Sequence, residues 1–251
     1  ALPTGEGQEL FLDKVFVRKI LVTGNSVFTS EELSEITVPY ENRSLTSEDL
    51  ESLRRALTLR YVNAGYINSG AILPDQAVRE GVITFQIVEG VLSQISVEGN
   101  KWFRESYIRD RIELGAGPPV NVNPLQERLQ LLQQDNRLRA IHAELRPGVK
   151  PGEAVLKVNV DEKTPFYAWF AFNNYQSPSV GAERGLLTLA HQNLTGHGDI
   201  LSLTLGRSEG LNPQIDVWYL LPVTVHDTTL LLRYRKNDYA VIDEIFDPLD
   251  T

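Results

Sequence analysis

Residues 20–33 of this chain read ILVTGNSVFTSEEL, and residues 95–108 read ISVEGNKWFRESYI. In each stretch an alternating apolar segment enters a Gly-Asn turn, which predicts a strand followed by a sharp change of direction. The same pattern at two places predicts one structural unit that occurs twice, and a repeat of this kind decides the fold class. The matching pairs are Ile20/Ile95, Val22/Val97, Gly24/Gly99, Asn25/Asn100 and Phe28/Phe103.

The rest of each unit predicts two helices and two further strands. Thr29 with Glu32 three residues later forms a capping-box pattern, and Thr46 marks a second helix start. The leucines after Thr46 recur at helical spacing until Gly65, a residue that favours a left-handed helix end. In the first unit the closing strands are predicted at 66–73 and 82–88. In the second unit the first strand is predicted at 94–98, and the helices at 105–112 and from Asn123-Pro124. The closing strands of the second unit are predicted at 140–145 and 154–160.

Beyond Lys163 the helical period disappears, and five segments alternate apolar and polar residues, which predicts neighbouring antiparallel strands. Long polar connections alternate with tight ones, and aromatic residues lie near strand ends. This pattern is typical of the wall of a membrane β-barrel, although a soluble sandwich or meander is the alternative. The sequence therefore predicts an α+β protein: two tandem β-α-α-β-β units followed by the first antiparallel strands of a barrel. The five segments are 166–174, 185–192, 200–207, 214–221 and 228–236.

The composition argues against several classes of protein. Lys and Arg number 24 against 33 Asp and Glu, and the net charge of −9 argues against a nucleic-acid partner. The chain has no cysteine, which removes disulfides and thiolate metal sites. It also has no methionine and no signal segment, so we expect a processed or truncated piece of a longer protein. No run of about 18 apolar residues occurs, so no transmembrane helix is expected, whereas membrane strands are still allowed.

No cluster of side chains predicts an enzyme. His191, His197 and Asp199 lie close together in the sequence, but they flank a Gly-rich turn and lack a metal-binding spacing, which favours a turn over a metal site. The serines lack the G-x-S-x-G context of a hydrolase nucleophile. We therefore expect no catalytic residue, no metal, no cofactor and no small-molecule substrate.

Residues 61–90 carry a motif that resembles a known domain. They are similar to the first POTRA domain of the two-partner-secretion outer-membrane transporters, the ShlB/FhaC/HecB family of hemolysin secretion and activation proteins. Two further similarities to that family follow, one in the second unit and one at the barrel start. The residues that carry the three similarities are Tyr61, Gly65-Tyr66, Pro74-x-Gln76, Gly81 and Glu89-Gly90; Leu145-x-Pro147-Gly148 with Gly152; and Asn173-Asn174, Gly181, Arg184 and Asn193-Leu194-x-Gly196-x-Gly198-Asp199.

The resemblance implies a domain order and a function. Residues 1–13 would be a linker remnant, 14–90 the first POTRA domain, 91–163 a second one of ShlB type, and 164–251 about five strands of an incomplete transmembrane barrel. The implied protein lies in the bacterial outer membrane, in contact with its lipid, with the POTRA domains in the periplasm. It would capture an unfolded, hemolysin- or adhesin-like exoprotein by an N-terminal secretion domain and pass it to the pore. An assembly factor of the BamA or TamA type and a soluble periplasmic POTRA adaptor are the alternatives.

The strand order of the unit suggests where a partner would bind. If the first and last strands pair, the middle-placed strands at 66–73 and 140–146 lie at sheet edges, where unpaired amides and carbonyls can bind an extended segment. The polar residues of the first edge are expected to be exposed, because a small core cannot satisfy them. The leucines of the last helix either line a groove beside the second edge or only fill the core. The predicted partner-binding residues are Ile67, Asn68, Ser69, Gly70, Ile72, Leu125, Leu129, Ala143 and Leu145.

Overall fold

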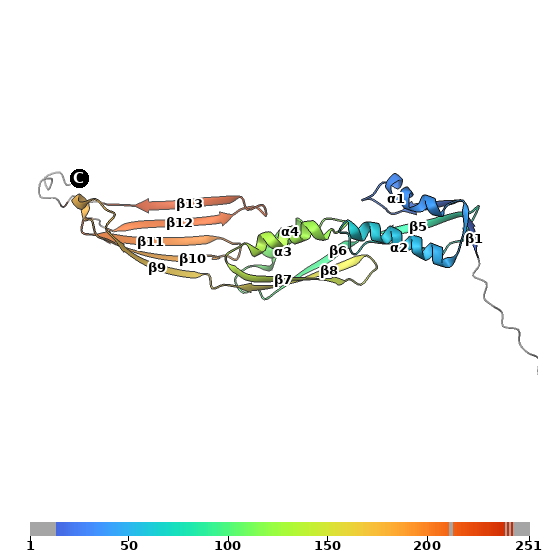
Figure 1. The fold of residues 1–251 in the computed structure, drawn as a ribbon. Coiled ribbons are helices and arrows are strands. Elements are labelled where there is room, and N and C mark those ends of the chain that lie inside the picture. Colours follow the sequence, from blue (N-terminus) through green and yellow to red (C-terminus); the bar gives the residue numbers. More distant parts are fainter. Residues whose placement is uncertain (1–13, 211–212, 239, 241, 243–251) are drawn as a thin grey trace, which may run out of the picture. The chain divides into compact units, whose positions relative to one another are not determined.

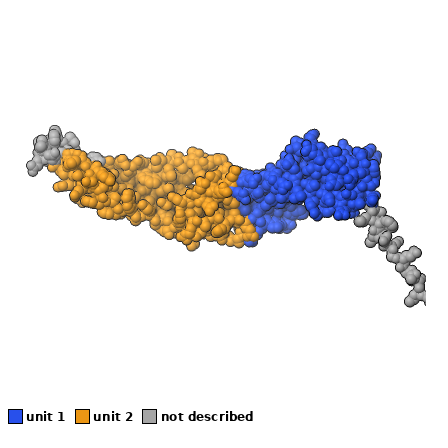
Figure 2. Space-filling view, in the orientation of Figure 1, with its two compact units in different colours: residues 1–95, 115–126, 145–156 blue, residues 96–114, 127–144, 157–251 orange. Residues whose placement is uncertain are grey.

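The structure is a computed structural model that describes residues 14–210, 213–238, 240 and 242 (Figure 1). The predicted linker at 1–13 lies outside the described residues. The chain divides into two compact units, which Figure 2 shows in blue and orange. Unit 1 comprises residues 1–95, 115–126 and 145–156, and unit 2 comprises residues 96–114, 127–144 and 157–251.

The first repeat forms a three-stranded sheet with two helices. Helices α1 and α2 both begin with a capping box, at Thr29 with Glu32 and at Thr46 with Asp49, and the predicted helix starts are confirmed. The β-branched residues of 15–23 predict one strand before the Gly-Asn turn, but this strand is interrupted at Arg18, and its first part pairs with an additional short strand. The elements are β1 (Val15–Val17), β2 (Lys19–Thr23), α1 (Ser30–Thr37), η1 (Val38–Tyr40), β3 (Arg43–Leu45), α2 (Ser47–Asn63), β4 (Gly70–Ile72) and β5 (Val82–Val88).

The sheet order of the first repeat is β2-β5-β4, so the first and last strands pair as expected. Strand β2 runs parallel to β5, and β4 runs antiparallel to β5. Apolar side chains of α1, α2 and β5 form the core of this repeat; Leu33, Leu53 and Phe85 have no exposed area. Full burial of each such side chain stabilises the fold by about 1.5–3 kcal/mol.

The second repeat has the same strand-helix-helix-strand-strand order, without counterparts of β1, η1 and β3. Its sheet order is β6-β8-β7, which again leaves the middle-placed strand at an edge. The predicted helix at 105–112 is confirmed, and both closing strands extend beyond the predicted segments. The elements are β6 (Val91–Glu98), α3 (Glu105–Glu113), α4 (Val122–Gln133), β7 (Leu138–Pro147) and β8 (Glu153–Glu162).

Five consecutive antiparallel strands follow, in the order β9-β10-β11-β12-β13, and each predicted strand is confirmed (Figure 1). Many large apolar side chains on β9 and β13 are exposed, including Phe170 at 66% and Leu232 at 58%. Among the described residues, no helix has the length and apolar character needed to cross a membrane. The elements are β9 (Phe166–Asn173), η2 (Pro178–Val180), β10 (Arg184–His191), β11 (Ile200–Ser208), β12 (Gln214–Pro222) and β13 (Thr229–Lys236).

Candidate functional site

The first predicted edge strand is shorter than its sequence suggests. A strand was expected over 66–73, but β4 covers only Gly70–Ile72, and residues 67–68 lie in a turn. Two of the predicted partner-binding side chains are exposed, Ile67 at 49% and Ile72 at 43%. The apolar side chains predicted for this edge are therefore accessible, while most of the expected strand backbone is not in a strand.

The predicted exposure of the polar residues at this edge is wrong. Ser69 is only 4% exposed, and its hydroxyl accepts a hydrogen bond from the Gly90 amide at 2.8 Å. Asn68 is half-buried, and its side-chain amide donates to the Gly152 carbonyl at 3.1 Å. The Ser69 hydroxyl and the Asn68 side-chain NH2 group are bonded to backbone groups remote in the sequence, which is how buried polar groups are tolerated. The Asn68 Oδ1 atom is buried and has no hydrogen-bond partner among the described residues.

Helix α2 closes the edge of β4. The amide and carbonyl of one strand residue point to the same side, and those of Ala71 point toward α2. The Ala71 amide donates to Thr58 Oγ1 at 3.0 Å, and Arg54 Nη1 donates to the Ala71 carbonyl at 3.3 Å. Gly70 is half-buried, and a Cβ added there would lie 3.2 Å from Thr58 Cγ2. An incoming strand would have to break both side-chain hydrogen bonds, so β4 is a poor template for strand addition.

Strand β7 is the longer of the two predicted edges. It has ten residues, Leu138–Pro147, against three for β4. Its predicted position at the edge of the sheet is confirmed by the order β6-β8-β7. Ala143 is exposed and Leu145 is half-buried. The length and exposure of β7 make it the better candidate for partner binding, which stays a prediction for both residues.

The leucines of α4 differ in burial. Leu125 is 4% exposed and Leu132 is 6% exposed, so both lie in the interior, whereas Leu129 is half-buried. This burial favours a core role for Leu125 over a groove role. Leu131, which the sequence reasoning did not select, is 55% exposed and is the apolar surface residue of this helix.

A glutamate at the end of β5 caps the turn that follows β2. Glu89 Oε1 accepts hydrogen bonds from the Ser26 amide at 2.6 Å, the Val27 amide at 3.0 Å and the Tyr61 hydroxyl at 2.9 Å. Its Oε2 also accepts from the Ser26 hydroxyl. The glutamate and tyrosine of the family-like motif are therefore joined to the Gly-Asn turn of the repeat.

The hydrogen bonds also set the charge state of this glutamate. Burial by itself raises the pKa of Glu89, but the hydrogen bonds donated by Ser26, Val27 and Tyr61 outweigh burial, so the pKa lies below its usual value. Burial and the hydrogen bond to Glu89 both raise the pKa of Tyr61. Glu89 is therefore held as a carboxylate by the turn it caps.

The second repeat contains the same arrangement. Glu162, at the end of β8, accepts hydrogen bonds from the amides of Lys101, Trp102 and Phe103 at 3.1, 2.7 and 3.2 Å. The side-chain amide of Asn100 donates to the Phe103 carbonyl at 3.0 Å, as Asn25 does to Phe28 in the first repeat. We call Glu89 and Glu162 the turn-capping glutamates. The sequence repeat thus extends to a duplicated carboxylate that fixes the Gly-Asn turn.

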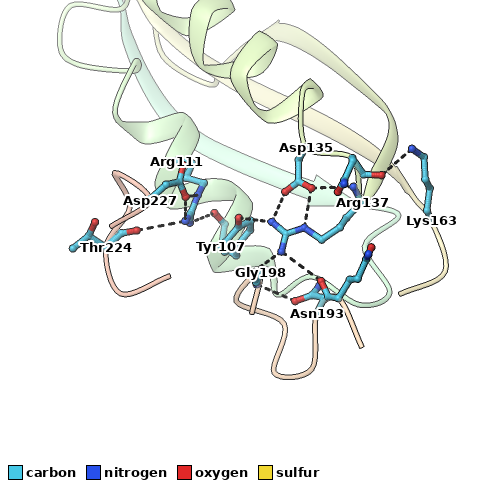
Figure 3. Close-up of polar contacts among 11 residues, drawn as sticks. Tyr107, Arg111, Asp135, Arg137, Lys163, Asn193, Gly198, Thr224 and Asp227 are labelled. Carbon is cyan, nitrogen blue, oxygen red and sulfur yellow. Dashed lines mark hydrogen bonds and ion pairs between the residues drawn. The ribbon is translucent and has the colours of Figure 1, made fainter. Parts of the chain in front are cut away.

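In unit 2, an arginine after α4 connects the second repeat to the five-stranded sheet (Figure 3). Arg137 is only 15% exposed and forms an ion pair with Asp135 at 2.6 Å. It also donates to the Gly198 carbonyl and, at 3.4 Å, to the Gln192 carbonyl. Burial lowers the pKa of Arg137, but the hydrogen bonds and charge of Asp135 more than offset burial and raise the pKa. The turn between β10 and β11 is therefore anchored to a buried ion pair.

Helix α3 holds the same sheet at two turns. The Arg104 amide and Nε donate to the Gly196 and Thr195 carbonyls, at 2.9 and 3.0 Å. Arg111 is 10% exposed at its side chain and pairs with Asp227 at 2.7 Å (Figure 3). Its guanidinium lies 3.7 Å from the centre of the Tyr107 ring, a close cation–π contact. We call this set of contacts around Arg104, Arg111 and Arg137 the arginine junction.

The histidines and aspartate considered as a metal set have structural contacts. Asp199 is fully buried and accepts hydrogen bonds from the Thr195 amide at 2.9 Å and the Tyr219 hydroxyl at 2.8 Å. The His191 ring packs edge-on against Phe166, with centroids 4.7 Å apart. These contacts agree with the interpretation of this segment as a turn. The sequence did not predict the arginine junction that holds it.

Two α+β repeats, each with its middle-placed strand at a sheet edge, are followed by an antiparallel five-stranded sheet. Residues 15–90 match the family model described as "POTRA domain, ShlB-type". The chain is a distant homologue of the two-partner-secretion transporters. It is 28% identical over 202 residues to the outer membrane transporter CdiB of Escherichia coli, a match that covers 80% of this chain and 34% of that protein. It is 25% identical over 189 residues to the hemolysin transporter protein ShlB of Serratia marcescens, with 73% and 32% covered.

Solved structures show the same fold. CdiB from Escherichia coli superposes with a TM-score of 0.58 at 24% identity and covers 88% of this chain and 42% of that chain. BamA from Haemophilus ducreyi without its POTRA domains 1–3 superposes with a TM-score of 0.55 at 16% identity, over 92% of this chain and 44% of that chain. The predicted fold class, POTRA-like α+β repeats followed by an antiparallel sheet, is confirmed.

The chain spans about a third of the length of the curated relatives it matches. Those relatives are transporters rather than enzymes, in agreement with the prediction that this chain is not an enzyme. CdiB is an outer-membrane transporter by name, which agrees with the predicted location.

Proposed function

We propose that this chain is the POTRA-bearing part of an outer-membrane transporter of the two-partner-secretion type, with its POTRA repeats in the periplasm and its sheet in contact with outer-membrane lipid. Its domains follow the predicted limits of 14–90, 91–163 and 164–251. The cargo is a secreted exoprotein of hemolysin or adhesin type with an N-terminal secretion domain. Homology to CdiB and ShlB supports this proposal over the assembly function suggested by the fold of BamA.

The exoprotein binds in an extended conformation by adding a strand to β7. The observation that carries this step is the ten-residue edge strand with exposed Ala143 and half-buried Leu145. Backbone hydrogen bonds along such an edge give affinity with little sequence selectivity, which suits an unfolded cargo. Strand β4 contributes less, because Thr58 and Arg54 occupy the Ala71 backbone groups.

The arginine junction gives this capture a direction. Arg137 and Arg111 attach the repeat that carries β7 to the turns at one end of the five-stranded sheet. An extended segment bound on β7 is therefore attached, through the second repeat, to one end of the five-stranded sheet. The repeat delivers the segment to that end of the sheet. No nucleic acid and no small-molecule substrate take part in this function.

Site-specific photocrosslinking tests the proposal. A photoreactive amino acid replaces Ala143 in the full chain, which is then incubated with the unfolded N-terminal segment of the hemolysin exported by the Serratia relative. We expect a crosslinked product. The matched control places the same group at Val149, which is 99% exposed but lies in the turn after β7. Equal crosslinking at both positions, or none at Ala143, would contradict strand addition on β7.

A further inference from the structure

The two Gly-Asn turns of the repeats differ in their surface residues. The first turn reads Gly-Asn-Ser-Val-Phe-Thr over residues 24–29, and the second reads Gly-Asn-Lys-Trp-Phe-Arg over residues 99–104. The turn-capping glutamates bind the same two amides in both turns, and the phenylalanine is buried in both. The backbone and the buried ring are therefore shared, whereas a lysine, a tryptophan and an arginine occupy the other three positions only in the second repeat.

The side chains of Lys101, Trp102 and Arg104 are exposed on the second turn, and the indole of Trp102 is 39% exposed. The Lys101 ammonium has no hydrogen bond or ion pair within the described part of the chain. Nε of Arg104 donates to the Thr195 carbonyl, but its two Nη atoms have no partner among the described residues. The turn thus presents two cationic groups with free donors beside an exposed indole.

The five-stranded sheet beside this turn has one polar and one apolar face. On the polar face the hydroxyls of Thr188 and Thr204 are 2.9 Å apart, and Asp216, opposite Thr204 in the register, pairs with two arginines of β13. Side chains alternate between the two faces along each strand. In the proposed transporter the apolar face is the one that contacts lipid. The apolar face includes Phe166, Phe170, Leu187, Leu189, Leu203 and Leu205.

Trp102 lies against the apolar face at the end of the sheet that α3 holds. Its ring packs edge-on against Phe166 and His191, with centroids 5.6 and 5.9 Å away. Phe166 begins β9, His191 ends β10, and the two are opposite each other in the register. An open cavity of about 490 Å³ continues from them along the same face, and its lining includes Leu189, Leu201 and Leu203. The indole therefore stands where the lipid-facing surface meets the second repeat.

These residue types match the boundary between a bilayer and water. Tryptophan favours this boundary because it has a large apolar ring and one polar N–H group. Lysine and arginine extend their apolar stems along such a surface and place their charges at the lipid phosphates. The whole chain has a net charge of −9, so the cationic turn is a local feature and not part of a generally basic surface.

We propose that the turn at 99–104 anchors the second repeat to the membrane surface: Trp102 inserts beside Phe166, and Lys101 and Arg104 bind the phosphate of an anionic phospholipid. The acyl chains of this lipid cover the apolar cavity on β9, β10 and β11. This inference rests on the proposed function, because it takes the apolar face of the sheet as the lipid-facing one. It adds a lipid site to the repeat that carries β7.

Quenching of Trp102 fluorescence by brominated lipids tests this inference. The 251-residue chain, with Trp169 and Trp218 replaced by phenylalanine, is placed in micelles of neutral detergent. Phosphatidylglycerol or phosphatidylcholine with bromine atoms in its upper acyl chains is then added. Half of the emission should be lost at a mole fraction of phosphatidylglycerol about fivefold or more below that of phosphatidylcholine, because each cation near an anionic lipid contributes about that factor.

Three variants of the same single-tryptophan chain locate the charge. Lys101→Ser gives the second turn the residue of the first, and it should raise the mole fraction of phosphatidylglycerol needed for half-quenching about fivefold while phosphatidylcholine is unaffected. Lys101→Arg should behave like the parent chain. Lys150→Gln removes an equal charge from an exposed lysine outside the turn and should change neither lipid. Circular dichroism checks that all three variants are folded.

A second reporter separates this inference from the proposed function. Phe170→Trp, in a chain whose three native tryptophans are phenylalanine, places an indole on the apolar face where Phe170 is 66% exposed, and both lipids should quench it. Absence of this quenching would reject both the lipid contact of the sheet and the anchor. Quenching there without quenching of Trp102, equal quenching of Trp102 by the two lipids, or an unchanged lipid preference in Lys101→Ser would overturn the anchor alone.

Discussion

Removal of the Arg137 side chain should destabilise unit 2 strongly. The side chains of Arg137 and Asp135 are 15% and 13% exposed, and they are joined by hydrogen bonds of 2.6 and 2.8 Å. Arg137→Met would leave the Asp135 carboxylate buried without its cation, together with the carbonyls of Gln192 and Gly198 that Arg137 contacts. Breaking one side of a buried ion pair costs about 3–5 kcal/mol, and we expect a loss in this range.

The assay is urea unfolding in detergent of the full chain with Trp169 and Trp218 replaced by phenylalanine, so that the tryptophan fluorescence comes from Trp102 alone. The Trp102 ring packs against Phe166 and His191, with centroids 5.6 and 5.9 Å away, so its emission reports on the contact between the second repeat and β9. Circular dichroism of the same samples reports on the strands.

A second variant separates the missing cation from the missing carbon chain. Arg137→Met combined with Asp135→Asn removes the buried negative charge and should recover more than half of the lost free energy of unfolding. If Arg137→Met costs less than about 1 kcal/mol, or if the double variant is no more stable than the single one, the ion pair does not carry this junction.

Three further predictions follow from the repeats. Glu89→Gln should lower the free energy of unfolding by about 1–3 kcal/mol because the turn amides lose a charged acceptor, and chemical denaturation measures the loss. The pKa of Glu89 in the folded chain lies below its usual value, so the carboxylate stabilises the fold above the unfolded-state pKa, and this stabilisation is lost as the pH falls through the folded-state pKa. Glu89→Gln should therefore reduce the loss of unfolding free energy at acid pH. An unchanged dependence of the unfolding free energy on pH would contradict this prediction. Gly99→Ala should lower the melting temperature of the chain more than Gly117→Ala does. A Cβ on Gly99, at φ 83°, would lie 2.3 Å from the Val160 carbonyl oxygen, whereas a Cβ on Gly117 would lie in open space. Equal decreases in melting temperature would refute this close approach. Thr58→Val should speed hydrogen exchange of the Ala71 amide while Thr58→Ser should not, because serine keeps the hydroxyl acceptor, and equal exchange in both variants would exclude the edge cap.

The parts of the fold that depend on local pattern could be predicted from the sequence. Both helix starts at Thr29 and Thr46 follow from capping boxes within four residues, and the five strands follow from period-two alternation. The repeat itself fixed the order of strands and helices. These signals need no knowledge of distant contacts.

The edge at β4 could not be predicted, because its state depends on remote partners. Ser69 and Asn68 look like exposed turn residues, but their partners Gly90 and Gly152 lie 21 and 84 positions away. The closing of the edge by Thr58 depends on how α2 packs on β4. Alternation alone contains no information on either contact.

The arginine junction was missed for the same reason. Asp135 and Arg137 are two positions apart and resemble a solvated turn, while the carbonyls that Arg137 contacts belong to Gln192 and Gly198, 55 and 61 positions away. The repeat offered one usable signal that sequence reasoning left unexplored. Glu89 directly follows the last strand of the first repeat, and Glu162 ends the last strand of the second; a carboxylate at this repeated position pointed to a shared structural role.

Hydrogen exchange of the β7 amides tests the capture mechanism most directly. The full chain is measured alone and with an excess of the unfolded N-terminal segment of the Serratia hemolysin. Strand addition predicts slower exchange along Leu138–Pro147 and no change in β8, whose position at the centre of its sheet already pairs both of its sides. Unchanged exchange in β7 while the segment is bound would contradict capture at this edge.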